Sequence, residues 1–171
     1  QVDERPLRLE PREFGSLVHA ILDRLVSDGC SEDQAADRVA EEQRSAIRPP
    51  LTIWELQVDE ALAHVRRAIE SLDHPAEADT WGEVHFGFDP DTPTDGGPWP
   101  PSAEVRLGEA KLRGKIDHLA LDATTGTAWV TDFKTGNRVL SPSRVLDGCA
   151  ELQRCLYAVA VSQLVPHVRS I

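Results

Sequence analysis

Gly114-Lys115-Ile116-Asp117 is followed, beyond a turn at Gly126, by Val130-Thr131-Asp132-Phe133-Lys134-Thr135-Gly136. The second segment is rich in β-branched and aromatic residues, which predicts a strand on which Asp132 and Lys134 leave the same face. The turn predicts a hairpin that brings Asp117 alongside. Two neighbouring carboxylates repel each other unless a cation lies between them, and a hard divalent metal ion is the natural occupant.

The size and composition of the chain limit what it can be. Its 171 residues predict a single domain covering 1–171, and the absence of methionine favours a piece of a longer protein. No apolar run approaches the roughly 20 residues that a membrane span needs, so no membrane partner is expected. The three cysteines, Cys30, Cys149 and Cys155, lack zinc-type spacing and indicate reduced thiols in a cytoplasmic protein.

The charge is strongly acidic, at −11, which argues against a free-standing nucleic-acid binder. The charge is unevenly distributed, however. Acidic residues concentrate in 32–42 and 89–95, whereas basic residues gather around the opening segments, so the acidic total can conceal a locally basic site. These basic residues are Lys111, Arg113, Lys115, Lys134, Arg138, Arg144 and Arg154.

Helical periodicity dominates the first part, about residues 12–74. Apolar residues recur at helical spacing from Glu13 to Asp28, and Gly29 follows as a helix-ending glycine would. Ser31 with Gln34 forms a capping box for a second helix. Thr52 with Glu55 predicts the same device for a third helix, which is expected to end near residue 74.

The period changes to two at Val84, which predicts a sheet over about residues 81–134. Strands are expected near 84–88, 104–107, 111–121 and 127–133, and the residues 89–102, rich in Pro, Gly and Asp, are expected to form a surface loop. Helical spacing returns over about residues 143–165. Helices therefore flank a small sheet built from consecutive strands.

Asp117, Asp132 and Lys134 are candidates for metal-assisted hydrolysis at phosphorus. Magnesium favours one or two carboxylates together with water and phosphate oxygens, and a lysine can neutralise charge that develops on the phosphate. An ordinary surface hairpin with a cross-strand ion pair explains the same three residues equally simply. The triplet alone leaves both interpretations open.

Four blocks of sequence together resemble the RecB-type branch of the PD-(D/E)XK nucleases. The blocks are Gly15-Ser16-Leu17-Val18-His19, Gly114-Lys115-Ile116-Asp117, Thr131-Asp132-Phe133-Lys134-Thr135-Gly136, and Gln153 with Tyr157. They occur in the order typical of that family and span most of the chain. The resemblance implies an α+β, restriction-endonuclease-like core, in which helices and an N-terminal helical segment flank a small mixed β-sheet.

The resemblance also implies roles for individual residues. Asp117, Asp132, His19 and the backbone oxygen of Phe133 would bind Mg²⁺ or Mn²⁺, and Lys134 would be the catalytic lysine. Glu83 on the first strand can add another carboxylate. Residues expected to contact DNA are Gln153, Tyr157, Lys111, Arg113, Lys115 and Arg138, although helix packing explains Tyr157 as well and a solvated charged face explains any one of the basic residues.

Some relatives carry four cysteines that hold an iron–sulfur cluster, but Cys30, Cys149 and Cys155 do not match that pattern, so no cluster is expected. The expected activity is a Mg²⁺- or Mn²⁺-dependent deoxyribonuclease, acting on single-stranded or duplex DNA ends supplied by a helicase or motor domain of the parent protein during DNA repair or recombination. The alternatives are a non-catalytic module that guides DNA or braces a larger assembly, and a metal-dependent RNase.

Overall fold

The computed structural model describes residues 8–44, 51–87, 97–100, 102–134 and 152–171. These residues form two compact units. The first contains the chain up to Leu72 together with Phe133 and Lys134. The second contains Asp73 to Asp132 and the C-terminal segment that includes residues 152–171. The chain therefore leaves the second unit and rejoins the first at the peptide bond between Asp132 and Phe133.

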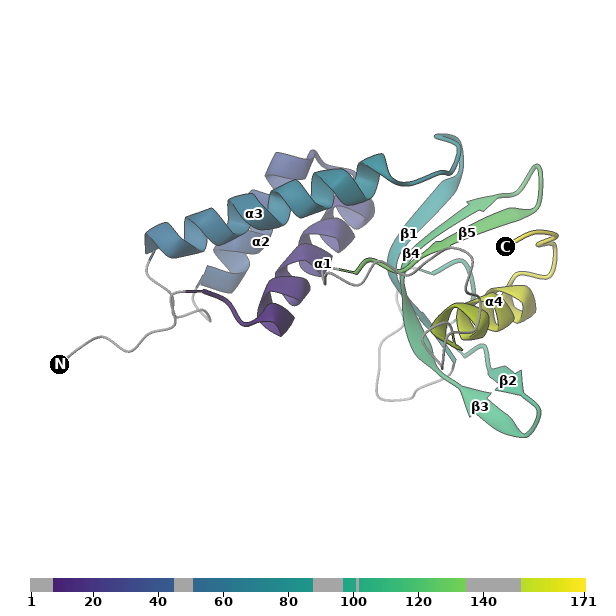
Figure 1. The fold of residues 1–171 in the computed structure, drawn as a ribbon. Helices are drawn as coiled ribbons and strands as arrows, with labels where there is room; N and C mark the ends of the chain where they lie inside the picture. The colour runs from purple at the N-terminus through teal and green to yellow at the C-terminus, as the bar shows by residue number, and fades with distance from the viewer. Residues whose placement is uncertain (1–7, 45–50, 88–96, 101, 135–151) are drawn as a thin grey trace. The chain divides into compact units, whose positions relative to one another are not determined.

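Three helices build the first unit, as the sequence predicts: α1 (Pro11–Asp28), α2 (Glu32–Arg44) and α3 (Leu51–Glu70) (Figure 1). Each helix turns its apolar stripe toward the other two, which removes those side chains from water. Phe133 is buried in the same core although it follows the last strand. The buried residues are Leu17, Val18, Ile21, Leu22, Ala35, Ala36, Val39, Trp54, Ala61, Leu62, Val65 and Phe133.

Local signals set two helix boundaries. Gly29 ends α1 in the left-handed conformation, with φ at 59°. The Ser31 capping box is confirmed, because the Ser31 N–H donates to Gln34 Oε1 at 3.2 Å and the Gln34 N–H donates to Ser31 Oγ at 3.3 Å. The Thr52 cap is wrong: α3 already begins at Leu51, so Thr52 lies inside the helix, which ends at Glu70 rather than near residue 74.

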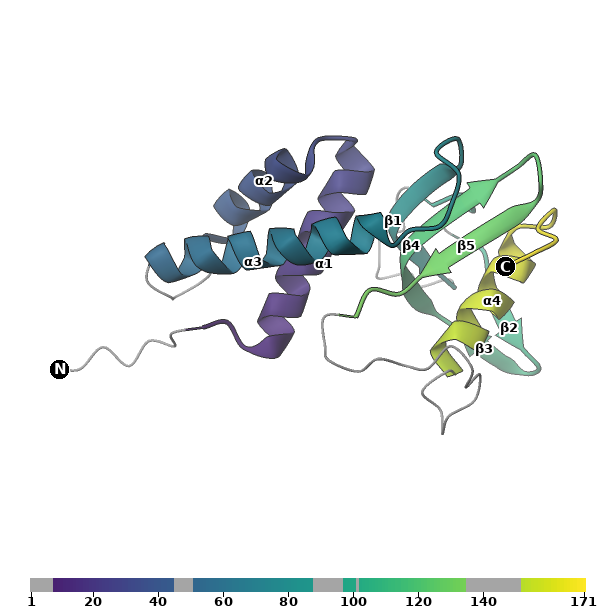
Figure 2. The same cartoon turned by 45° about the horizontal axis from the view of Figure 1, so that its top comes forward.

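The second unit contains a three-stranded antiparallel sheet in the order β1-β4-β5, formed by β1 (Asp79–Phe86), β4 (Gly114–Asp122) and β5 (Thr127–Thr131) (Figure 2). The short strands β2 (Val105–Leu107) and β3 (Ala110–Leu112) form a separate hairpin. A parallel bridge joins Thr127 to Ser170. The Gly126 turn is confirmed, with φ at 70°.

Two strand predictions need correction. The single strand expected over 111–121 is divided between β3 and β4, and it breaks at Arg113. Gly87 packs against this break so closely that a Cβ on it would lie 2.1 Å from the Leu112 carbonyl oxygen. The last strand ends at Thr131 rather than Phe133. Asp132 and Lys134 therefore follow β5, and a strand does not place their side chains on one face.

Helix α4 (Leu152–Leu164) packs on the sheet and closes the core of the second unit. The start expected for this helix, residues 143–151, lies outside the described residues. Trp99, expected on a surface loop, is buried in this core and its Nε1–H donates to the His85 carbonyl at 2.8 Å. The other buried residues are Val84, Phe86, Val105, Ile116, Leu119, Ala128, Tyr157, Ala160 and Val161.

The described elements confirm an α+β arrangement of the restriction-endonuclease-like type, with helices beside a small sheet. None of the helices in the described ranges is both long and apolar enough to cross a membrane.

Candidate metal centre

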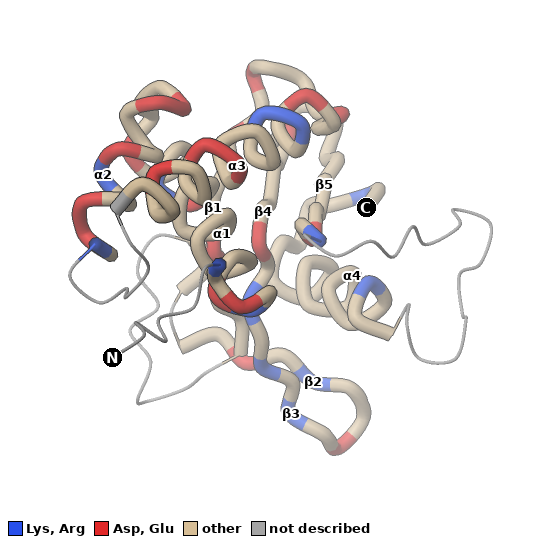
Figure 3. The backbone as a smooth tube through the Cα atoms, turned by 60° about the vertical axis from the view of Figure 1, so that its left-hand side comes forward, with Lys and Arg blue, Asp and Glu red and all other residues tan. Residues whose placement is uncertain are grey.

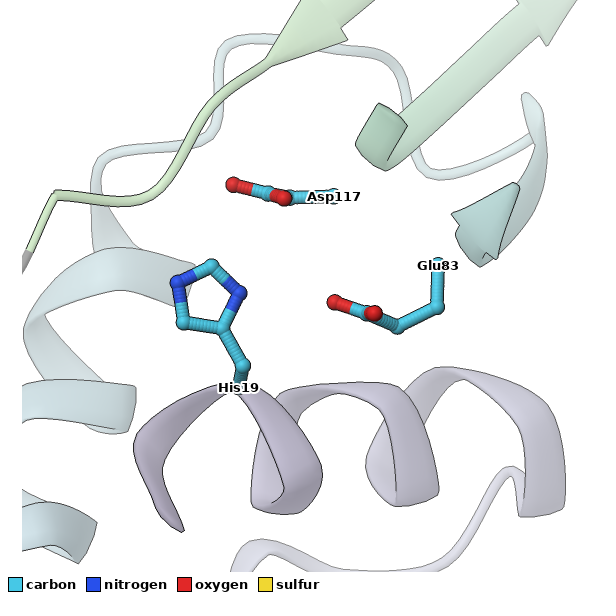
Figure 4. Close-up of side chains that lie close together, drawn as sticks. All are labelled: His19, Glu83 and Asp117. Carbon is cyan, nitrogen blue, oxygen red and sulfur yellow. The ribbon is translucent and has the colours of Figure 1, made fainter. Parts of the chain in front are cut away.

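Three carboxylates, which we call the carboxylate row, lie on or directly after the strands of the second unit: Glu83 on β1, Asp117 on β4 and Asp132 after β5. The pairs Gly82–His118 and Val84–Ile116 flank Glu83 and place it opposite Asp117. The β4–β5 ladder ends at the pair His118–Thr131, and Asp132 follows Thr131 directly. Carboxylate oxygens of Glu83 and Asp117 approach within 4.8 Å, and Figure 4 shows both side chains extending in the same direction.

This row costs energy in the metal-free protein. Like charges that lie directly opposite each other on neighbouring strands destabilise a sheet. Glu83, Asp117 and Asp132 are half-buried, where water screens their repulsion less than it would on an open surface. Lys115 forms an ion pair with Glu83. Closely spaced carboxylate oxygens are the donors that a hard divalent cation takes.

The backbone at Glu83 is strained as well. Its φ is 49°, and it is the one residue other than glycine with positive φ in the part of the chain that the structure describes. Such a conformation costs of order 1–3 kcal/mol and tends to occur at functional sites. The ladder between β1 and β4 omits the pair Glu83–Asp117, although the pairs on both sides keep the same register. The strain therefore redirects the Glu83 side chain without shifting the strand.

A chain of hydrogen bonds from α4 holds one end of the row. Gln153 Nε2 donates to Asp132 Oδ1 at 2.9 Å and also lies 2.5 Å from the Tyr157 hydroxyl. That hydroxyl donates to the Lys115 carbonyl oxygen at 2.8 Å. Because Gln153 and Tyr157 are one helical turn apart, a single helix face fixes both the Asp132 carboxylate and the start of β4.

The surroundings of Tyr157 shift the pKa of its phenol. Burial raises the pKa of its phenol, and the nearby Asp132 and Asp117 carboxylates raise that pKa further, while the hydrogen bond from Gln153 lowers it. Tyr157 is 6% exposed and packs edge-on against Phe86, with ring centroids 6.0 Å apart. Its hydroxyl is bonded inside the protein, so a contact between Tyr157 and DNA stays a prediction.

The first unit contains a pair of possible metal ligands of its own. His19, on the inner side of α1, places Nε2 3.1 Å from the Phe133 carbonyl oxygen. Burial of the Phe133 side chain in the helical core holds this carbonyl next to α1. Both atoms are of a kind that binds divalent metals, so this pair would be able to hold an ion if one were bound.

The remaining predicted residues are distributed as follows. Lys134, Arg113 and Lys115 are exposed, and Arg138 lies outside the described residues. Sequence reasoning missed His118, which is 2% exposed beside Asp117 and stacks on His74 with centroids 5.2 Å apart. Its position in the alternating pattern of β4 could have indicated an inward side chain. It also missed Gln163, for which helical spacing gives no signal.

A family model described as the PD-(D/E)XK nuclease superfamily matches residues 2–169, nearly the whole chain. The chain belongs to this superfamily. Searches of curated proteins and of solved structures found no match.

PD-(D/E)XK nucleases generally depend on divalent metal ions, and the donor atoms present here suit that chemistry. Carboxylates and a backbone carbonyl are hard oxygen ligands, and an imidazole suits transition metals such as manganese. Membership in the PD-(D/E)XK superfamily thus supports a nuclease that contacts nucleic acid.

Proposed function

We propose that the chain is a Mg²⁺- or Mn²⁺-dependent deoxyribonuclease domain of the RecB-type branch, which hydrolyses phosphodiester bonds at DNA ends during repair or recombination. The observation that carries this proposal is the carboxylate row, in which Glu83 and Asp117 lie opposite each other on neighbouring strands and Asp132 directly follows β5. Neighbouring carboxylates repel each other, and a divalent cation bound between them would replace that repulsion by attraction.

We assign the ligands as Asp117, Asp132, the Phe133 carbonyl and His19, with Glu83 as an additional carboxylate. The peptide bond between Asp132 and Phe133 supports this set, because it joins the carboxylate row to the carbonyl that His19 contacts at 3.1 Å. Gln153 is a positioning residue that orients the Asp132 carboxylate through its 2.9 Å hydrogen bond.

When bound, the metal ion supplies Lewis acidity, which lowers the pKa of water and offsets phosphate charge. A water oxygen attacks phosphorus and loses a proton to solvent, the bond from phosphorus to the leaving sugar oxygen breaks, and that oxygen takes up a proton from solvent. The exposed Lys134 ammonium steers the attacking water and stabilises the negative charge that develops on the phosphate.

We further propose that a helicase or motor domain of the parent protein supplies the DNA. The charge of −11 supports this, because a domain that receives its substrate from a partner does not need a broad positive field to capture it. Cys30 and Cys155, free thiols among the described residues, fit a reducing compartment, and we place the reaction in the cytoplasm.

The test is cleavage of labelled single-stranded DNA, duplex DNA and RNA with Mg²⁺, with Mn²⁺ and with a chelator. Asp132→Ala and Lys134→Ala should each lower the cleavage rate at least about 10²–10³-fold, the scale of losing one group that stabilises developing charge. Arg66→Gln, on the surface of α3, is the control. Cleavage at the wild-type rate by both variants contradicts the proposal, and a preference for RNA replaces the assigned substrate.

A further inference from the structure

The β2–β3 hairpin brings two cations to one point. Arg106 and Lys111 are direct partners in the strand register, so their side chains share one face of the hairpin. Both contact Glu104: the Arg106 Nη2 lies 2.7 Å from Oε2 and the Lys111 Nζ lies 2.5 Å from Oε1. A guanidinium and an ammonium thus converge on a single carboxylate.

The geometry of this cluster suits an anion from solution. The side chains of Arg106 and Lys111 are 53% and 63% exposed, so a ligand can reach both. A guanidinium binds phosphate in the same forked manner as it binds carboxylate. The hydrogen bonds from Lys111 and Arg106 also lower the pKa of the Glu104 carboxyl, so it stays charged and occupies the position of an anion.

The backbone of the hairpin is fixed, so only its side chains have to move. The Arg106 N–H donates to Gln163 Oε1 at 3.0 Å, and Gln163 Nε2 donates to the Arg106 carbonyl at 2.6 Å. The Gln163 amide therefore pairs with β2 as a neighbouring strand would. Val105 is 1% exposed, which anchors the other face of β2 in the core.

The cluster lies on a basic path that leads to the carboxylate row. Lys and Arg residues follow the hairpin and the start of β4, whereas many acidic residues lie on the helices of the first unit (Figure 3). Lys111 and Lys115 are four residues apart, so at most about 13 Å of extended chain separates them. A surface pocket of about 250 Å³, lined by Glu104, Lys111 and Arg113 among others, lies along this path.

We propose that Arg106 and Lys111 bind a backbone phosphate of the nucleic-acid strand and that this phosphate takes the place of the Glu104 carboxylate. The proposal rests on the nuclease function, because it supplies a second contact for a strand that is cut at the carboxylate row. Gln163 holds the hairpin backbone in place while Glu104 is displaced. The site reads no base, since both cations contact only phosphate oxygens.

The experiment measures binding of a fluorescein-labelled oligothymidylate by fluorescence anisotropy, in chelator and over a series of salt concentrations. Arg106→Gln/Lys111→Gln should weaken binding about tenfold and reduce the slope of log K against log salt by about 0.7–1.4, since one single-strand phosphate contact contributes about 0.7. Glu104→Gln should tighten binding about threefold, the scale of an exposed ion pair.

The matched control is Arg24→Gln/Arg66→Gln, which removes two arginines that pair with acids on the helices and should leave the salt slope unchanged. Circular dichroism confirms that each variant folds. An equal loss of binding in the control, no binding by the wild-type protein, or a Glu104→Gln variant that does not bind more tightly would overturn the proposal.

Cleavage assays separate this proposal from the nuclease function. If Asp132→Ala cuts as fast as the wild type, the nuclease function fails whatever the anisotropy shows. If Asp132→Ala is inactive while the hairpin variants bind as the wild type does, the hairpin proposal alone fails. Duplex DNA and RNA oligomers, measured in the same way, show whether the bound phosphate belongs to single-stranded DNA, duplex DNA or RNA.

Discussion

Charged side chains are arranged differently on the helices of the first unit and around the carboxylate row of the second. On the helices, opposite charges meet on the surface, as Arg24 with Glu42 at 2.7 Å and Arg66 with Asp33 at 2.9 Å. In the carboxylate row, Glu83 and Asp117 lie opposite each other, Asp132 follows β5, and the backbone at Glu83 is strained. Departures from stable packing tend to mark functional sites. In the proposed site the second unit therefore supplies the carboxylates, whereas α1 supplies His19.

The largest effect is expected at the centre of the carboxylate row. Asp117→Asn should lower the metal-dependent cleavage rate at least about 10³-fold, because a neutral amide binds a hard cation far more weakly than a carboxylate does. In chelator the same variant should keep or gain up to about 1 kcal/mol of unfolding free energy, because it relieves repulsion. Urea unfolding measures the second effect.

Asp28→Asn is the matched change on the helices. Asp28 pairs with Arg38 at 2.7 Å and with Arg24 at 3.6 Å, so its neutralisation should cost up to about 1 kcal/mol. Opposite signs for the two variants support the distinction between the units. A loss of stability for Asp117→Asn in chelator equal to that of Asp28→Asn would contradict it.

The next effect concerns pH and the buried His118. Burial, and then the charge of the stacked His74, lower the pKa of His118 from 6.5 to about 4. The folded state therefore resists protonation: its stability is fully present above pH 6.5 and is lost as pH falls through about 4. The loss amounts to about 3 kcal/mol, at 1.36 kcal/mol for each unit of pKa.

His118→Phe keeps an aromatic ring beside His74 and removes the titration. In chelator, the unfolding free energy of wild type minus that of the variant should fall by about 3 kcal/mol between pH 7 and pH 4. Other titrating groups are shared by both proteins, so they cancel in this difference. A difference that stays constant over that range would show that His118 does not carry the pH dependence.

A smaller effect tests the strained backbone. At Glu83, with φ at 49°, Gly should be more stable than Ala by about 1 kcal/mol, because alanine retains the strain. At the exposed Glu41 within α2 the order should reverse, with Ala more stable than Gly by about 1 kcal/mol. Thermal unfolding of the four variants gives both differences. If Ala were more stable than Gly at both positions, the backbone at Glu83 would not be strained.

Sequence alone predicts what depends on neighbours in the chain. The apolar period predicts the first and third helices, and Ser31 with Gln34, which predicts the second, forms the expected cap because both groups lie within one turn. The cap predicted at Thr52 is wrong, although Thr52 has the same pattern with Glu55, because α3 starts before Thr52. Propensity is a weak prior that tertiary context overrides.

In the candidate site, too, the sequence predicts the features that depend on residues close in the chain. Gly126 predicts the turn that returns Asp132 to Asp117, because a hairpin is a local structure. The extent of burial at His118 and Trp99, and the bond between Gln163 and Arg106, depend on residues far away in the chain, and no local pattern carries that information. Phe133 can be predicted only in part: its place in the motif is visible in the sequence, whereas its burial in the helical core is not.

The central claim is that the carboxylate row, together with His19 and the Phe133 carbonyl, binds one catalytic metal ion. Crystals soaked in Mn²⁺, with diffraction measured across the manganese absorption edge, test it most directly. We expect an anomalous peak bound by Asp117 and Asp132, with His19 or the Phe133 oxygen as a further ligand, and no such peak in Asp117→Asn crystals. A protein that cuts DNA while manganese binds elsewhere, or not at all, would contradict the claim.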